Sequence, residues 1–174
     1  MAYLLRGYGA RVTGLPLSRD QRRIATERAE AAGLSDRVEF RMQDYREVTE
    51  RFDRVVSVGM FEHVGVPQYR DFFSNLRRRL TEDGIALIHT IGRMKPPAGT
   101  SPWLDKYIFP GGYVPALSEI MTAVERESLW ACDVEIWRLH YARTLNHWQE
   151  RFRARIHELR DLDTPVSLDM AKQD

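Results

Sequence analysis

Phe52-Asp53-Arg54-Val55-Val56-Ser57-Val58-Gly59-Met60-Phe61-Glu62-His63-Val64-Gly65 is the stretch that decides the fold. Its first half, as far as Val58, is a short run of mainly apolar, β-branched residues, which is typical of a buried strand in a parallel sheet. Its second half changes to glycine, aromatic and charged residues. Ligands of an open parallel sheet sit beyond the carboxyl ends of its strands, so we expect this turn to form one wall of a binding cleft. The alternative is that Glu62 and His63 are a solvated loop pair.

Further strands and helices alternate on both sides of this stretch. The other short apolar runs predict strands at residues 10–15, 37–42, 84–90 and 133–139. Helical spacing of apolar residues predicts helices at 21–32 (capped by Ser18 and stopped by Gly33), 68–80, 118–129 (capped by Ser118) and 140–162. Residues 94–113 are rich in proline, glycine and aromatics and predict a long loop. Strands that alternate with helices indicate an α/β fold.

Composition restricts the function classes. The 174 residues are enough for one domain, and 26 basic against 25 acidic residues give a net charge of +1, so no nucleic acid partner is expected. The single cysteine, Cys132, excludes an internal disulfide and a multi-cysteine metal site, and no histidine spacing favours a metal. Neither a signal peptide nor a membrane span is expected, which favours a cytoplasmic protein.

The basic run Arg77-Arg78-Arg79 ends the predicted helix at 68–80. It is a solvated helix end in one interpretation, because cations are stabilised at helix C-termini. It contacts anionic lipid head groups in the other.

Candidate binding residues follow four of the predicted strands. Pro16 to Gln21 follow the first strand, Asp44 and Tyr45 the second, Glu62 the third, and His89 ends the fourth. The turn could be simple helix capping and His89 a structural histidine. In the functional interpretation, Asp44 accepts from an adenine amine while the Tyr45 ring packs on its face, and Glu62 is a base or part of an anion site.

Six segments in sequence order resemble the cyclopropane-fatty-acyl-phospholipid synthases and their mycolic acid relatives. They span about residues 10–152 and are Val12-Thr13-Gly14-Leu15-Pro16-Leu17-Ser18-Arg19-Asp20-Gln21, Asp44-Tyr45-Arg46, Ser57 to Gly65, Leu87-Ile88-His89-Thr90-Ile91-Gly92, Tyr107-Ile108-Phe109-Pro110-Gly111-Gly112, and His140-Tyr141-Ala142-Arg143-Thr144-Leu145 with Trp148. The resemblance implies a Rossmann-like class I methyltransferase sheet with helices on both faces. The first strand and its Gly-rich turn are missing from this chain. We therefore expect a partial S-adenosylmethionine-dependent methyltransferase domain at residues 1–162 and a tail at 163–174.

The resemblance also implies an activity and its residues. It implies transfer of a methylene group from S-adenosylmethionine to a cis double bond of an unsaturated phospholipid acyl chain, with aromatic faces stabilising the carbocation and a bound bicarbonate removing the proton. The residues implied for the bicarbonate site are Glu62, His89, Ile91 through its backbone, and Tyr141. Those implied for the cofactor are Pro16, Leu17, Ser18, Arg19, Asp20, Gln21, Asp44 and Tyr45. The candidates for the aromatic faces are Phe61, Tyr107, Phe109 and Tyr141.

The expected setting is cytoplasmic, peripheral at the inner membrane surface, with phospholipid as partner and a homodimer as a possible assembly. Alternatives remain open. The product could be a methyl-branched or hydroxylated lipid or a methylated small amine, and the chain could be an inactive fragment or a partner-binding module.

Overall fold

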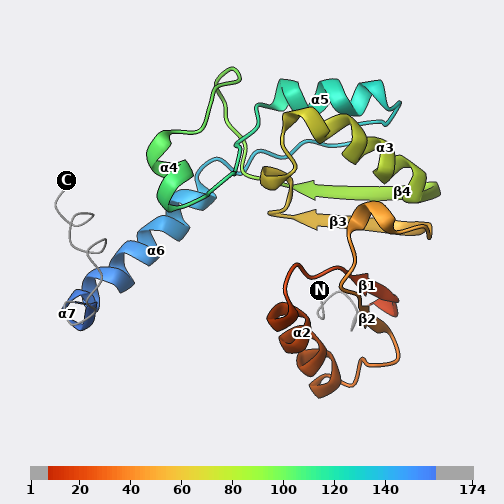
Figure 1. The fold of residues 1–174 in the computed structure, drawn as a ribbon, viewed down its shortest axis with the longest axis horizontal. Coiled ribbons are helices and arrows are strands. Elements are labelled where there is room, and N and C mark those ends of the chain that lie inside the picture. The colour runs from red at the N-terminus through yellow and green to blue at the C-terminus, as the bar shows by residue number, and fades with distance from the viewer. Residues whose placement is uncertain (1–7, 160–174) are drawn as a thin grey trace. The chain divides into compact units, whose positions relative to one another are not determined.

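The computed structural model describes residues 8–159, and these divide into two compact units with the boundary between residues 131 and 132 (Figure 1). The first unit contains β1 (Val12–Gly14), α2 (Arg19–Ala31), β2 (Val38–Phe40), η1 (Tyr45–Glu47), β3 (Phe52–Val58), η2 (Phe61–His63), η3 (Val66–Gln68), α3 (Tyr69–Arg79), β4 (Leu80–His89), α4 (Pro102–Tyr107) and α5 (Leu117–Arg126). The second contains α6 (His140–Ala154) and α7 (Ile156–Leu159). The expected tail at 163–174 lies outside the described residues.

The strands form two parallel pairs, which confirms the α/β class. In one pair β1 lies beside β2, with Val12 opposite Val38. In the other β3 lies beside β4, with Phe52 opposite Leu80 and Val58 opposite His89. The strand predicted at 84–90 starts earlier, at Leu80, because the start of β3 also pairs with it across a register shift.

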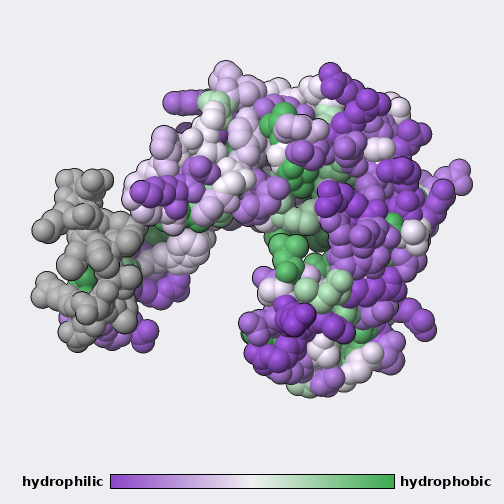
Figure 2. All heavy atoms as spheres, in the orientation of Figure 1, coloured by the Kyte–Doolittle hydropathy of each residue, from purple (hydrophilic) through white to green (hydrophobic). Residues whose placement is uncertain are grey.

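α2 has the predicted cap at Ser18 and the predicted stop at Gly33, and it runs from Arg19 to Ala31 instead of over 21–32. The Ser18 hydroxyl accepts the Gln21 N–H at 3.1 Å, and the Gln21 side chain accepts the Leu17 N–H at 3.1 Å. These two bonds satisfy amides that the first turn leaves without partners. Gly33 follows the helix at φ +67°, a backbone conformation that glycine adopts without strain. The surface of α2 is largely hydrophilic (Figure 2).

The core of the first unit lies between α3, α5 and one face of the β3–β4 pair. Its buried members are Phe61, Tyr69, Phe72, Phe73, Leu76 and Ala123. Val55, Ala86 and Ile88 face this cluster from the strands. Side chains alternate across a strand, so their neighbours lie on the other face. These neighbours, Val56, Val58, Ile85 and Leu87, are exposed.

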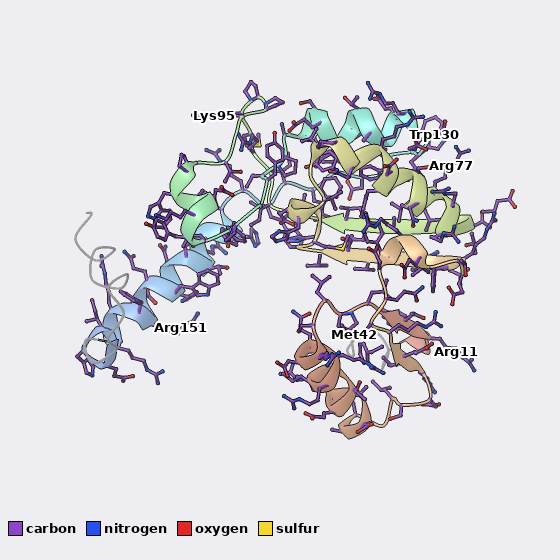
Figure 3. The ribbon with its side chains drawn as sticks, in the orientation of Figure 1. Arg11, Met42, Arg77, Lys95, Trp130 and Arg151 are labelled. Carbon is purple, nitrogen blue, oxygen red and sulfur yellow. The ribbon has the colours of Figure 1, made fainter. Side chains whose placement is uncertain are left out.

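Three predictions about single elements were wrong. Residues 133–139 form no strand, since no described strand supplies the ladder of hydrogen bonds that an extended segment needs. The loop expected at 94–113 contains α4, which Ser101 caps at the Leu104 N–H and Pro102 begins; Lys95 in Figure 3 marks the loop before it. α5 starts at Leu117 instead of after a Ser118 cap, because the Glu119 carboxylate accepts the Ala116 N–H.

The last predicted helix is interrupted. α6 ends at Ala154, and α7 begins again at Ile156. Residues 160–162 of that prediction lie outside the described residues.

Candidate functional site

Glu62 is a buried carboxylate just beyond the carboxyl end of β3, and only 5% of the residue is exposed. Its Oε1 accepts the backbone N–H of Ile91 at 2.7 Å, and its main-chain carbonyl accepts the N–H of Tyr113 at 2.8 Å. Its Oε2 is buried and has no hydrogen-bond partner among the described residues. The carboxylate therefore has one oxygen fixed and one open to a further donor.

Phe61 anchors the backbone next to Glu62. Its side chain is fully buried, stacked on the ring of Tyr69 at 4.4 Å between centroids. The ring of Phe72 meets it edge-on at 5.1 Å, and that of Phe73 lies at 5.7 Å. Each aromatic pair stabilises the cluster by roughly 0.5–1.5 kcal/mol beyond burial, so the position of Glu62 is set by the core.

The ends of β3 and β4 meet beside Glu62. The N–H of Gly59 donates to the carbonyl of His89 at 3.0 Å, and Gly59 has φ +66°, where a side chain would be strained. β4 ends at His89, whose residue is exposed, and Ile91 follows two residues later. The structure thus brings the predicted residues Glu62 and Ile91 into direct contact.

Tyr113, Glu119 and Arg93 support the site, although none was among the predicted residues. The Tyr113 hydroxyl donates to both Glu119 oxygens at 2.9 and 3.0 Å. The Arg93 guanidinium lies over the Tyr113 ring at 5.6 Å, and its Nε donates to the Val114 carbonyl at 2.7 Å. Burial and the Glu119 hydrogen bond raise the pKa of Tyr113, so it stays a neutral donor.

The predicted cofactor residues lie at the carboxyl ends of β1 and β2. These strands are parallel neighbours, with Gly14 opposite Phe40, so the residues that follow them share one edge of the pair. The stretch 16–21 forms the turn into α2, and its residues from 17 to 21 are exposed. This turn presents the N-terminal end of a helix, which favours negatively charged groups.

Asp44 already has a partner. Its carboxylate accepts the backbone N–H of Arg46 and pairs with the Arg46 guanidinium, whose Nε lies at 2.9 Å. The side-chain hydrogen bond from Arg46 is the largest of the effects that lower the pKa of Asp44 to about 2. Tyr45 packs edge-on against Phe72 at 5.7 Å and is half-buried. An adenine at Asp44 would share the carboxylate with Arg46.

Tyr141 lies in the second unit, on α6. It is 43% exposed and meets Trp148 edge-on at 6.4 Å. Its place in the site with Glu62 stays a prediction.

The chemistry available at Glu62 is that of a desolvated carboxylate. Such a group accepts hydrogen bonds strongly and can hold a proton donor beside a developing positive charge. No group of three or more His, Cys, Asp or Glu side chains within residues 8–159 could hold a metal ion.

The architecture is that of the solved cyclopropane synthases, which are class I methyltransferases in fold. The structure of the cyclopropane synthase MmaA2 from Mycobacterium tuberculosis matches with a TM-score of 0.80 and 25% identity, covering 91% of this chain and 60% of that one. The mycolic acid cyclopropane synthase CmaA1, complexed with SAH and CTAB, matches with a TM-score of 0.80 and 26% identity, covering 92% and 61%.

The model of the mycolic acid cyclopropane synthetase family matches residues 1–171, so the chain belongs to this family. It is 40% identical over 162 residues to the cyclopropane-fatty-acyl-phospholipid synthase of Escherichia coli (strain K12), and 38% identical over 163 residues to a probable fatty acid methyltransferase of Pseudomonas putida. The match covers 91% of the chain in the first case and 90% in the second, but only 40% and 41% of those relatives. The tuberculostearic acid methyltransferase UfaA1 of Mycobacterium tuberculosis is 38% identical over 152 residues, covering 84% of the chain and 36% of that relative. The chain thus spans about two fifths of these curated relatives.

Proposed function

We propose that the chain carries the catalytic centre of an enzyme that transfers a methylene group to cis double bonds of unsaturated phospholipid acyl chains, with S-adenosylmethionine as cosubstrate. The observation that carries this proposal is the buried Glu62 carboxylate, fixed at Oε1 by the Ile91 N–H and open at Oε2. Membership of the family and the name of the Escherichia coli relative support it.

S-adenosylmethionine supplies an electrophilic methyl group when bound. An alkene is a weak nucleophile, so the protein must hold it close to that methyl group and exclude water. We assign the turn at 16–21 together with Asp44 and Tyr45 to holding the cosubstrate. The alkene carbon that takes the methyl group leaves its neighbour as a carbocation. S-adenosylhomocysteine is the leaving group of this methyl transfer, and loss of one proton from the new methyl group to a base then closes the ring.

We assign bicarbonate as the group that takes this proton, and the open Oε2 of Glu62 supports this assignment. Bicarbonate carries one O–H, and Oε2 is a buried acceptor with no hydrogen-bond partner among the described residues. The Ile91 N–H already donates to Oε1, so Ile91 acts on the anion by holding Glu62 in place. We assign His89 and Tyr141 as further holding groups, as the family resemblance implies.

A methyl-branched product is the second candidate. Two relatives are named fatty acid methyltransferases, one of them tuberculostearic acid methyltransferase. Such an enzyme would carry out the same methyl transfer but would convert the carbocation to a different product. The fate of the alkene and the position of the new carbon therefore separate the two products.

We propose contact with a membrane surface because the substrate resides in a bilayer. No helix of residues 8–159 has the length and apolar character needed to cross a membrane. Peripheral attachment at the cytoplasmic face and assembly as a homodimer belong to the same proposal.

The test is mass spectrometry of lipids from cells that lack their own synthase and express the gene that encodes this chain. We expect a gain of one CH2 with loss of the alkene and no methyl branch. Glu62→Gln should lower the product by roughly 10²- to 10⁴-fold, the usual range for groups that manage a proton transfer. Glu125→Gln, a matched change at an exposed position of α5, should leave the product unchanged. A retained alkene, a branched product or full activity of Glu62→Gln would contradict the proposal.

A further inference from the structure

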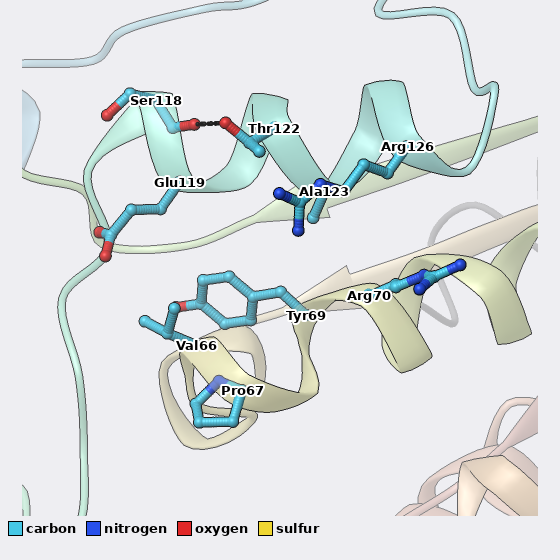
Figure 4. Close-up of a pocket in the computed structure, with 9 residues that line it drawn as sticks. All are labelled: Val66, Pro67, Tyr69, Arg70, Ser118, Glu119, Thr122, Ala123 and Arg126. Atoms are coloured by element: carbon cyan, nitrogen blue, oxygen red, sulfur yellow. Dashed lines mark hydrogen bonds between the residues drawn. The ribbon is translucent and has the colours of Figure 1, made fainter.

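A cavity lies between the start of α3 and α5, and Glu62 is not among the residues that line it (Figure 4). Its volume is about 510 Å³, within the range of small-molecule sites. Val66, Pro67 and Ala123 form apolar walls, and the Tyr69 ring is part of its lining. Nothing in the proposed methylene transfer uses this cavity.

The Tyr69 hydroxyl is a buried donor without a partner. The residue is 2% exposed, and its hydroxyl makes no hydrogen bond among the described residues. Figure 4 shows the hydroxyl directed toward Val66, at the end of the groove where Glu119 lies. Burial raises the pKa of Tyr69, and the charge of Glu119 adds to this, so the phenol keeps its proton. An unpaired buried hydroxyl is costly, and an oxygen acceptor in the cavity would remove that cost.

Arg126 provides a cation at the other side of the cavity. No ion pair or hydrogen bond joins its side chain to any residue within 8–159, and Figure 4 shows its guanidinium lying back over the groove beside Ala123. Arg70 also lines the cavity, but it turns away to pair with Glu127, with Nε 3.0 Å from the carboxylate. The Arg126 end therefore keeps an uncompensated positive charge.

The far end prefers a neutral group. The Glu119 carboxylate there already accepts from the Tyr113 hydroxyl and the Ala116 N–H. A second anion beside it would be repelled, whereas a carbonyl or hydroxyl oxygen could accept from Tyr69. A ligand that suits both ends has an anionic head, a short apolar body and a neutral oxygen.

We propose that this cavity binds a phosphate ester, with the phosphate on the Arg126 guanidinium and a neutral oxygen of the ester on the Tyr69 hydroxyl. A guanidinium donates two parallel hydrogen bonds to phosphate oxygens, which gives this pairing its geometry. The same chemistry is present in a phospholipid head group and in a free phosphate ester such as glycerol 3-phosphate. The cavity borders the residues that support Glu62, because Tyr69 stacks on Phe61 and Glu119 accepts from the Tyr113 hydroxyl.

The experiment titrates the ¹⁵N-labelled 174-residue chain with sn-glycerol 3-phosphate and follows the amide shifts of residues 118–126. We expect a Kd on the order of 1 mM, as for a small ligand with few contacts. Arg126→Gln should weaken binding by about tenfold or more, and Tyr69→Phe by about threefold to tenfold. Arg126 is exposed, so its replacement leaves the core intact. The control is Arg28→Gln, which removes the same charge from an exposed position of α2 that does not line the cavity.

A second arm measures flotation with vesicles of phosphatidylcholine containing phosphatidylglycerol. If the chain binds vesicles and Arg126→Gln abolishes that binding, the source of the phosphate is a lipid head group. If the chain binds glycerol phosphate but not vesicles, the source is a free ester. Absence of shifts at 118–126 overturns the proposal. Equal weakening by Arg126→Gln and Arg28→Gln also overturns the proposal, because it would report general charge attraction only.

Discussion

Replacing Phe61 with alanine tests whether the aromatic cluster sets the position of Glu62. Phe61 is fully buried and has three aromatic rings within 4.4–5.7 Å of its own. Phe→Ala changes in cores cost about 3–5 kcal/mol, and the three ring neighbours place this site near 4 kcal/mol. That loss is a large part of the roughly 5–15 kcal/mol by which a domain is stable. The urea midpoint of unfolding should fall accordingly.

Phe109→Ala is the matched control for this measurement. Phe109 is 37% exposed, and we expect the same chemical change there to cost about 1 kcal/mol. Amide hydrogen exchange adds a local readout, since a looser Glu62 should speed exchange of the Ile91 N–H in Phe61→Ala. Equal destabilisation by the two variants, or an unchanged Ile91 exchange rate, would refute the role given to Phe61.

Two further predictions concern the β1–β2 pair and the turn after it. The hydrogen bond from Arg46 lowers the pKa of Asp44 from 3.8 to about 2, so the stability that this pair adds is complete above about pH 4 and lost as the pH falls toward 2. Acid titration of the free energy of unfolding should show this loss, and Asp44→Asn should remove it; an Asn variant with the same acid profile would contradict the assignment. Gly14→Ala should lower the melting temperature through a cost of about 1–3 kcal/mol, because its Cβ would lie 2.6 Å from the Phe40 ring. Gly99→Ala has nothing within 4 Å and should change little; equal shifts would show that the Phe40 contact does not matter.

The positions of β3 and β4 were predictable because a parallel strand reads as a short continuous apolar run. The expectation that β3 is buried was wrong, because Val56 and Val58 on one of its faces are exposed. The early start of β4 at Leu80 was not, since Leu80 also continues the helical spacing of α3. Ser101 followed by Pro102 was a visible start signal for α4 within a segment that otherwise resembles a loop. The strand predicted at 133–139 was wrong for a different reason. An apolar run forms a strand only where a neighbouring strand pairs with it.

The site residues that follow the strand ends could be predicted from the sequence. The residues that support them could not. Glu62 follows the apolar run that forms β3, and the family resemblance adds Ile91, which the structure places within hydrogen-bond distance. Tyr113 and Glu119 lie in a segment far from Glu62 in the sequence. No local pattern predicts that these two segments contact each other. The helical spacing of apolar residues in 68–80 explains the buried ring of Tyr69 and says nothing about its hydroxyl.

The donor that fixes Glu62 belongs to the main chain at position 91, not to a side chain. Any residue with a backbone N–H supplies that bond, so the side chain at 91 is free to change with the shape of the molecule bound beside it. Only proline, which has no N–H, removes the donor. Engineering of position 91 can therefore reshape the cleft while the carboxylate stays where it is.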